Sequence, residues 1–217
     1  MDESVILHAE RSFLVCRKPV GVECEHELPA LLAEGMKCKA DSLYCVPRLD
    51  RAVGGVMVWA RTPKAAAELS RQVQEKALQK AYFAVCSGIP APDTGEMRDL
   101  LFKDSVKQKS FAVSSFRRGV KEALLDYRVL QTAALNGSPA ALVRVTLRTG
   151  RFHQIRCQFA TRGHPLLGDG KYGSRERGCT TALWSCRLAF FHPETHAPLV
   201  FEAAPPRVFP WDRFPWN

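Results

Sequence analysis

Short apolar segments of strand length, each followed closely by turn residues, are the feature that most limits how this chain can fold. Residues 56–60 read Val-Met-Val-Trp-Ala, and five apolar residues in a row indicate a strand buried on both faces. Residues 13–16 and 81–86 have the same character, and proline or glycine comes soon after each of them. Runs this short favour a β-sheet as the core of the fold.

Helical patterns alternate with these strands. Thr62 and Pro63 have the residue types of an N-cap and a first helical position, and apolar residues recur at helical spacing as far as Ala77. A short helix is expected over residues 29–37, and another helical segment starts at residues 149–151. The predicted fold class is α/β of the α+β type: a mixed, mostly antiparallel β-sheet flanked by helices and loops.

The second half of the chain is predicted to be largely β. The expected strands are residues 110–115, 124–130, 141–147, 183–190 and 199–203. Basic segments and the Asn136-Gly137 turn separate the first three of them, which are expected to form an antiparallel meander. With 217 residues, the chain is expected to form a single domain over residues 1–217.

Positive charge is concentrated in the second half of the chain. The whole sequence has a net charge of +9, and residues 101–217 hold 18 of the 31 basic residues but only 8 of the 22 acidic ones. A concentrated positive field indicates a polyanionic partner, because each neutralised phosphate releases condensed counterions. On charge alone, the alternative of a solvated basic surface stays open.

The sequence contains no sign of export or membrane insertion. No run approaches the roughly 18 apolar residues of a membrane helix, and the start, MDESVILHAERSF, lacks the basic and apolar regions of a signal peptide. We therefore expect a cytoplasmic protein with no membrane partner, and a monomer by default.

The eight cysteines are expected to remain thiols in such a protein. Cys24 and His26, with Cys16, Cys38 and Cys45 nearby, raise the possibility of a zinc site. However, the segment from Cys16 to Cys45 lacks the Cys-x-x-Cys or His-x-x-x-His spacing that supports such a site, so no metal is expected.

The segment VPRLDRAVGG, residues 46–55, places Asp50 between Arg48 and Arg51 on a loop before a core strand. One interpretation is a turn aspartate that caps its own loop. The other is a nucleophile, because adjacent arginines would keep the carboxylate ionised. No second acid lies close enough in sequence to suggest glycoside hydrolysis by paired carboxylates.

Arginines and lysines alternate with aromatic residues between residues 144 and 177. Guanidinium groups beside aromatic rings suit single-stranded or splayed nucleic acid, although a solvated helix face has the same composition. Taken alone, Tyr82 could be a core aromatic residue and His153 a helix residue without a role. The basic residues are Arg144, Arg148, Arg151, Arg156, Arg162, Lys171, Arg175 and Arg177.

Taken in order, these segments resemble the RluA family of pseudouridine synthases over nearly the whole chain, from about Val5 to Pro206. The matching motifs are Lys18-Pro19-Val20-Gly21-Val22, Arg48-Leu49-Asp50 with Gly55, Lys80-Ala81-Tyr82, Arg148-Thr149-Gly150-Arg151-Phe152-His153-Gln154-Ile155-Arg156, Gly163-His164-Pro165-Leu166-Leu167-Gly168-Asp169 and Phe191-His192-Pro193-Glu194-Thr195.

The resemblance implies an enzyme that isomerises uridine in RNA to pseudouridine: the N1 glycosidic bond breaks and C5 bonds to C1′. It also implies that Asp50 is the nucleophile, that Tyr82 packs on the uracil ring and takes or relays a proton, and that Arg156 pairs with Asp50. Whether the carboxylate attacks C1′, attacks the base or assists an elimination stays open.

The resemblance further implies a set of substrate-binding residues. Leu183 would pack against the base or the tyrosine, and Arg48 would support the duplex after the target nucleotide is flipped out. Arg151 and His153 complete the predicted set. The expected partner is ribosomal or transfer RNA, and no cofactor is expected, because the reaction exchanges no electrons, hydride or water.

Three positions depart from the family pattern. Pro47 stands where histidine is common, Val53-Gly54 where Thr-Ser is common, and Trp184-Ser185 where His-Ala is common. These changes keep open the alternative of a non-catalytic RNA-binding protein with the same fold. A DNA-binding protein is less consistent with the sequence, which contains no helix-turn-helix or zinc-finger pattern. No RNA-binding domain would fit before Val5, so we expect the catalytic domain to recognise its own substrate.

Overall fold

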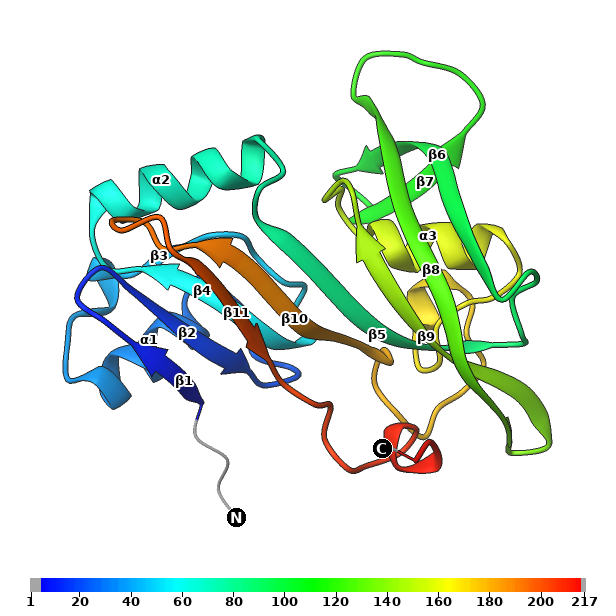
Figure 1. The fold of residues 1–217 in the computed structure, drawn as a ribbon. Coiled ribbons are helices and arrows are strands. Elements are labelled where there is room, and N and C mark those ends of the chain that lie inside the picture. The colour runs from blue at the N-terminus through cyan, green and yellow to red at the C-terminus, as the bar shows by residue number, and fades with distance from the viewer. Residues whose placement is uncertain (1–4, 216–217) are drawn as a thin grey trace. The chain divides into compact units, whose positions relative to one another are not determined.

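The computed structural model describes residues 5–215, which form two compact units (Figure 1). The first unit contains the residues up to Lys80 together with Trp184–Pro205. The second contains Ala81–Leu183 and the residues from Pro206 onward. None of the helices within residues 5–215 has the length and apolar character that crossing a membrane requires.

The first unit is built on a mixed sheet, in the order β1, β2, β4, β10, β11, with β3 also paired to β4. Its strands are β1 (Ile6–Ala9), β2 (Phe13–Lys18), β3 (Tyr44–Cys45), β4 (Gly54–Ala60), β10 (Leu183–Phe191) and β11 (Pro198–Glu202). All pairs in this sheet are antiparallel except β4 with β10, which run parallel where Trp184 lies opposite Gly54. The predicted mixture of strand directions is therefore confirmed.

Both faces of β4 are buried, as its apolar sequence predicted. Val56 and Val58 belong to a core cluster that includes Leu69 of α2 (Pro63–Gln74). Met57 and Trp59 point the other way, into a cluster with Leu28 of α1 (Glu27–Met36). Period-2 alternation therefore lets one strand supply two layers of core.

The two helices of the first unit begin at local capping residues. The Thr62 hydroxyl accepts a hydrogen bond from the Ala65 amide at 3.2 Å, which confirms the predicted N-cap of α2. Helix α1 starts two residues before the expected position. The Glu23 carboxylate accepts hydrogen bonds from the Glu25 and Glu27 amides at 2.7 and 2.9 Å, which satisfies donors at the helix start.

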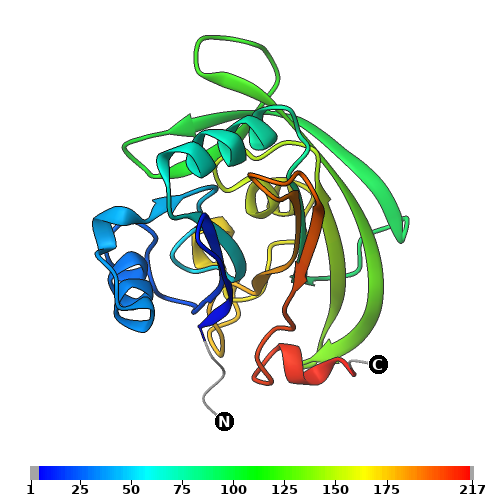
Figure 2. The ribbon, with the colours of Figure 1, turned by 60° about the vertical axis from the view of Figure 1, so that its left-hand side comes forward.

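The second unit contains an antiparallel sheet in the order β5, β9, β8, β6, β7, whose long strands β8 and β9 curve visibly (Figure 2). Its strands are β5 (Gln79–Ser87), β6 (Thr94–Asp104), β7 (Lys109–Val113), β8 (Val120–Leu135) and β9 (Ser138–Leu147). The predicted meander is wrong in order, because β6 lies between β7 and β8. The sequence gives little indication of β6, because this segment follows turn residues and carries several charged residues. Only Met97 and Leu101 of this strand are buried.

Helix α3 (Gln154–Thr161) packs on this second sheet, and its predicted core residues Ile155 and Phe159 are buried. The Phe159 ring meets the Tyr127 ring of β8 edge-on at 6.0 Å. The helix does not begin at residues 149–151 as predicted, because His153 has a left-handed backbone with φ 51°. Single-turn 3₁₀ helices complete the described elements: Ala40–Ser42, Gly170–Tyr172 and Trp211–Arg213.

Gly55 is the position in the first unit where a side chain is least tolerable. Its φ is 119°, and an added Cβ would lie 2.2 Å from the Ser185 carbonyl oxygen. We expect Gly55→Ala to lower the free energy of unfolding by about 3 kcal/mol, because backbone must move to remove the clash. The matched control is Gly137→Ala, which has φ 76° but nothing within 4 Å, and about 1 kcal/mol is expected. Urea unfolding measures both, and equal losses would contradict the steric explanation.

Candidate active site

Asp50 lies on the loop between β3 and β4, as predicted, and the loop is closed by backbone hydrogen bonds. The Val53 amide donates to the Asp50 carbonyl oxygen at 3.0 Å, and the Gly21 amide donates to the Arg51 carbonyl oxygen at 2.9 Å. A second segment, at the end of β2, therefore holds the loop. The Asp50 carboxylate is carried on a constrained turn.

Lys18 is the cation beneath this loop, and it is fully buried. Its Nζ donates three hydrogen bonds, to the carbonyl oxygens of Pro19 at 3.0 Å, Arg51 at 3.1 Å and Val53 at 2.8 Å. Burial lowers the pKa of Lys18, while the nearby charges of Cys24 and Asp50 oppose that shift. In the sequence, Lys18 stands out only as part of the Lys18-Pro19-Val20-Gly21-Val22 motif. A lysine that ends an apolar strand before a proline is the signal that could have identified it.

The arginines that flank Asp50 in sequence both pair with glutamates near the start of α1. Among residues 5–215, the guanidinium group of Arg48 pairs with Glu25, and that of Arg51 pairs with Glu27 at 3.1 Å. Both arginines are exposed, so these ion pairs contribute little to stability. These ion pairs bind both arginines to the segment that leads into α1.

Two of the departures from the family pattern contact each other in the first unit. A Cβ at Gly54 would lie 2.4 Å from Cζ3 of the Trp184 ring, so the ring occupies the space that a larger residue at position 54 would need. The Trp184 indole N–H donates to the Ala203 carbonyl oxygen at 2.9 Å, which fixes the ring. The departures from the family pattern at positions 54 and 184 therefore depend on each other, because the Trp184 ring fits only beside a residue without a side chain.

In the second unit, Arg156 is held by Asp169, a residue that sequence reasoning did not single out. Its Nε donates to one Asp169 oxygen at 2.7 Å and a terminal nitrogen donates to the other at 2.8 Å. Both side chains are buried. A bidentate pair of this kind fixes the plane of the guanidinium group. Gly168-Asp169 within the matched motif was the available signal for Asp169.

His153 belongs to an aromatic cluster around Arg156. Its ring stacks on Phe152 at 3.9 Å, and its Nδ1 lies 3.1 Å from the Tyr172 hydroxyl. That hydroxyl accepts a hydrogen bond from the Ser110 amide at 2.8 Å, and the Arg156 guanidinium lies 5.2 Å from the centroid of the Tyr172 ring. Burial, followed by the positive charge of Arg156, lowers the pKa of His153 to about 3. His153 is therefore a neutral group at physiological pH.

The remaining predicted site residues lie elsewhere in the second unit. Tyr82 is 5% exposed on β5, opposite Val145 of β9, and Leu183 is also 5% exposed. Arg151 directs its Nε to the Glu122 carbonyl oxygen at 2.8 Å, at the start of β8. Within the second unit, the structure thus brings His153 and Arg156 together at Tyr172. Asp50 and Arg48 belong to the first unit.

Part of the basic segment 144–177 is neutralised within the protein. Arg148 pairs with Asp126, Arg156 with Asp169, and Arg162 with Asp99. These three arginines are thus less suited to bind phosphate than the sequence indicated. The other basic side chains of this segment, for which the described residues 5–215 show no ion pair, are Arg144, Arg151, Lys171, Arg175 and Arg177.

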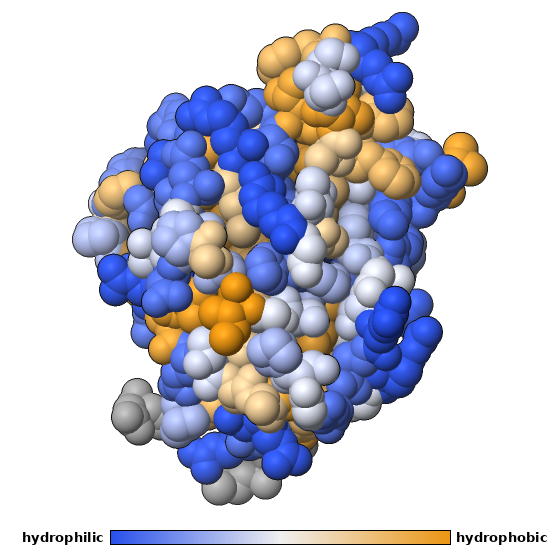
Figure 3. Space-filling view, turned by 90° about the vertical axis from the view of Figure 1, so that its right-hand side faces the viewer, coloured by the Kyte–Doolittle hydropathy of each residue, from blue (hydrophilic) through white to orange (hydrophobic). Residues whose placement is uncertain are grey.

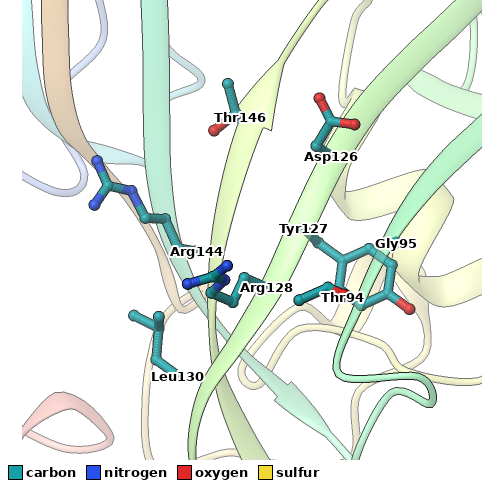
Figure 4. A pocket seen from close by; sticks show the side chains of 8 residues that line it. All are labelled: Thr94, Gly95, Asp126, Tyr127, Arg128, Leu130, Arg144 and Thr146. Carbon is teal, nitrogen blue, oxygen red and sulfur yellow. The ribbon is translucent and has the colours of Figure 1, made fainter.

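Arg144 borders a hollow of about 540 Å³ on the second sheet (Figure 4). Arg128 of β8 lies directly opposite Arg144 of β9, and both are exposed without an ion pair in the described part of the chain. Like charges in opposite positions are unfavourable, so this pair is suited to an external anion. The molecular face shown in Figure 3 is largely hydrophilic, with separate hydrophobic patches. The hollow is lined by Thr94, Gly95, Asp126, Tyr127, Arg128, Leu130, Arg144 and Thr146.

A second basic area, which we call the lysine–aromatic surface, comprises Lys103, Lys109, Phe111 and Phe152. Lys103 Nζ lies 4.5 Å from the centroid of the Phe152 ring, and Lys109 Nζ lies 5.5 Å from that of Phe111. Both rings are partly exposed. Partly exposed rings beside ammonium groups provide stacking partners for bases and charges for phosphates.

The described residues contain no group of three or more His, Cys, Asp or Glu side chains placed to hold a metal ion. All eight cysteines are thiols.

The Arg156–Asp169 pair gives a direct test of burial. We expect Asp169→Asn to lower the free energy of unfolding by about 3–5 kcal/mol, because it leaves a buried guanidinium without its counter-charge. The control is Asp126→Asn, which removes a bidentate partner from the exposed Arg148 and should cost less than about 1 kcal/mol. Urea unfolding measures both variants. Similar losses would show that the buried pair has no special role.

His153 should make stability depend on pH. Its pKa is about 3 in the folded protein and near 6.5 when unfolded, so the unfolded chain binds more protons between these values. Stability should fall as the pH drops from about 6.5 toward 4, and His153→Asn should flatten that decline. Asparagine tolerates the left-handed backbone at this position. Unfolding in urea at several pH values measures the slope. His26→Asn, at an exposed position, serves as control, and equal slopes for wild type and His153→Asn would refute the assignment.

Comparisons with known proteins agree on one family. A family model described as RNA pseudouridylate synthase matches residues 12–161. The chain is 33% identical over 207 residues to the dual-specificity RNA pseudouridine synthase RluA of Pasteurella multocida (strain Pm70), with 92% of each chain covered. It is 30% identical over 223 residues to the ribosomal large subunit pseudouridine synthase D of Neisseria meningitidis serogroup B (strain ATCC BAA-335 / MC58), covering 93% of this chain and 58% of that protein.

A solved structure has the same fold. The protein titled Human RNA Pseudouridylate Synthase Domain Containing 1 superposes with a TM-score of 0.82 at 24% identity, covering 95% of this chain and 85% of that one. This likeness confirms the predicted fold class. The chain spans only 50–58% of the length of the first curated relatives that it matches. Because the family model covers most of the sequence and the Pasteurella RluA is matched nearly end to end, the chain belongs to the RluA family of RNA pseudouridine synthases.

Proposed function

We propose that this protein isomerises uridine in RNA to pseudouridine, with Asp50 as the nucleophile. The observation that carries this proposal is the Asp50 loop, which stands on the buried ammonium group of Lys18 in a chain of this family. A nucleophilic carboxylate must be ionised and held in a fixed direction. The hydrogen bonds of Lys18 to the carbonyl groups of Arg51 and Val53 hold the loop, and thus the carboxylate, in a fixed direction. The positive charge of Lys18 favours the ionised carboxylate.

Tyr82 and Arg156 are proposed to complete the catalytic group with Asp50. Tyr82 is buried on a strand, which suits a ring that must pack flat against a uracil base. Arg156 is held in one orientation by Asp169, which suits a guanidinium that must face a carboxylate without reorganising. For the reaction to proceed, these groups must meet around one flipped nucleotide. Membership of the family supports that arrangement.

RNA is the proposed substrate, and two basic areas are suited to hold it. The Arg128–Arg144 hollow can bind phosphate, and the lysine–aromatic surface can bind phosphates and stack on unpaired bases. Arg48 is proposed to enter the duplex and Leu183 to contact the base. His153 and Arg151 are proposed to bind substrate, and His153 would act as a neutral hydrogen-bonding group rather than as a cation.

The class of RNA is proposed as ribosomal or transfer RNA. The name of the Neisseria relative refers to the large ribosomal subunit, which supports the first of these for this chain. We further infer a monomer that works in the cytoplasm without membrane contact, cofactor or metal. The reaction itself rearranges bonds within one nucleotide, so the side chains of the proposed site can perform it.

A non-catalytic RNA-binding protein is the alternative, and the altered residues Pro47 and Val53-Gly54 favour it. Two features of the first unit weaken this alternative. Lys18 binds the carbonyl oxygen of Val53, so the bond does not depend on the side chain at position 53. The Trp184 ring fills the space beside Gly54, so the absence of a side chain at position 54 is compensated by a larger residue at position 184. Incubation with RNA that contains 5-fluorouridine distinguishes the two functions, because only an enzyme forms an adduct or rearranged product.

Replacing the nucleophile tests the proposed function. Asp50→Asn should lower the turnover of RNA that carries tritium at C5 of uridine by about 10,000-fold or more, because the amide cannot attack. RNA affinity should change little. Asp41→Asn, at an exposed position of the same unit, is the matched control and should release tritium at the wild-type rate. Wild-type turnover by Asp50→Asn would refute the role of Asp50, and an inactive wild type that binds RNA would favour the alternative.

A further inference from the structure

A cluster of sulfur atoms lies directly against the Asp50 loop. Cys24 Sγ is 3.3 Å from the Leu49 carbonyl oxygen, to which the thiol donates, and 3.9 Å from the Met57 sulfur. Cys24 belongs to a core cluster against which Cys45 packs, and both cysteines line the same hollow. Cys24 therefore contacts the residue that precedes Asp50 and lies in one cluster with a second thiol.

Small molecules can reach this pair of thiols. Cys24 and Cys45 both line a hollow of about 360 Å³, together with Glu25 and Arg48. Cys24 is 6% exposed and Cys45 is partly exposed. The cluster is thus accessible to small oxidants and thiol reagents, unlike Cys16, which is fully buried.

The two thiols differ in their readiness to ionise. The hydrogen bond from Cys45, and further the Leu49 backbone and the charge of Lys18, lower the pKa of Cys24 to about 7 against the effect of burial. The same hydrogen bond and burial raise the pKa of Cys45. Near neutral pH the thiolate is therefore concentrated on Cys24, and Cys45 keeps its proton. A reactive thiolate beside a protonated thiol is the arrangement that disulfide formation requires.

We propose that Cys24 and Cys45 form a site of reversible oxidation, at which hydroperoxides convert the two thiols into a disulfide against the Asp50 loop. Each step conserves atoms and electrons. The Cys24 thiolate attacks the terminal oxygen of the hydroperoxide, an S–O bond forms, the O–O bond breaks, and hydroxide (from hydrogen peroxide) or alkoxide (from an organic hydroperoxide) leaves and takes up a proton. Cys45 then attacks the Cys24 sulfur of this sulfenic acid. The S–S bond forms, the S–O bond breaks, and the proton of Cys45 leaves with the hydroxyl as water.

In total, two thiols are oxidised and one hydroperoxide is reduced. A thiol reductant reverses the change by exchange through a mixed disulfide. In the reduced protein, the protonated fraction of Cys24 donates to the Leu49 carbonyl oxygen, whereas the Cys24 sulfur in the disulfide carries no proton and cannot donate. The loop that carries Asp50 thereby loses one of its contacts with the body of the first unit. An effect of this loss on turnover rests on the proposed function, whereas the oxidation itself does not.

Peptide mapping tests the proposed link. The protein is treated with hydrogen peroxide near pH 7, alkylated and digested with trypsin. We expect residues 18–37, which contain Cys24, to be joined to residues 40–48, which contain Cys45, with the loss of two hydrogen atoms. Cys38 lies on a separate peptide, so a link through it is recognisable. Absence of the joined peptides after oxidation, or a link through another cysteine, would overturn the proposal.

Single variants test which thiol reacts first. In Cys45→Ser, oxidation should stop at a sulfenic acid on Cys24, which dimedone traps. In Cys24→Ser, Cys45 should stay unlabelled under the same conditions. Cys179→Ser is the matched control and should form the disulfide at the wild-type rate. Labelling of Cys45 in the absence of Cys24, or no labelling of Cys24 in Cys45→Ser, would contradict the assigned order.

The consequence for the loop has its own readout. Hydrogen exchange of the amides in residues 46–55 should increase several-fold after oxidation and return to the reduced value after treatment with dithiothreitol. Tritium release should fall and recover in parallel, while Cys45→Ser should not form the disulfide or show this reversible fall. If the disulfide forms and exchange rises but the reduced protein has no turnover, the proposed function fails and the oxidation site stands. Unchanged exchange in the disulfide form would overturn the proposed effect on the loop.

Discussion

The position of Asp50 depends on one buried ammonium group. Lys18 directs its three protons to three backbone carbonyl oxygens, and two of these belong to the loop that carries Asp50. A carbonyl oxygen that faces inward needs a donor, and a buried lysine needs acceptors, so each group removes a cost that the other would incur. The result joins the end of β2 to the start of β4. The rest of the first unit, including the two-sided core of β4, keeps these strand ends in register.

The second unit also contains a buried cation, Arg156, and here the partner is the carboxylate of Asp169 rather than backbone carbonyl groups. Arg156 and Asp169 are both buried, and the bidentate geometry satisfies both oxygens of the carboxylate. Such a pair contributes less to stability than its Coulomb energy suggests, because both ions lose their hydration. Its benefit is orientation: the guanidinium group and the neighbouring rings of Tyr172 and His153 have little freedom to rearrange. The proposed chemistry needs groups that are already in place before the substrate arrives.

Local signals in the sequence predicted local structure well. The core strand at residues 56–60 and the Thr62-Pro63 start of α2 depend on neighbours within a few positions, and both are confirmed. The motifs also led to the correct family. Ion pairs between residues far apart in sequence were harder to predict. The sequence did not indicate that Arg48 and Arg51 pair with Glu25 and Glu27, and the Arg156–Asp169 pair follows neither helical nor strand spacing. Strand β6 was missed because only two of its residues face the core strongly enough to reveal it.

The contact between Gly54 and Trp184 constrains how this sequence can change. A serine at position 54 would meet the indole ring, and a smaller residue at position 184 would leave a void above Gly54. Either step toward the common family residues, taken alone, passes through a strained or underpacked intermediate. The two sites are 130 positions apart in sequence yet lie opposite each other in a parallel strand pair, so each residue limits the size that the other can have. Exchanging both residues together would avoid the loss of packing or the clash that either exchange alone would cause.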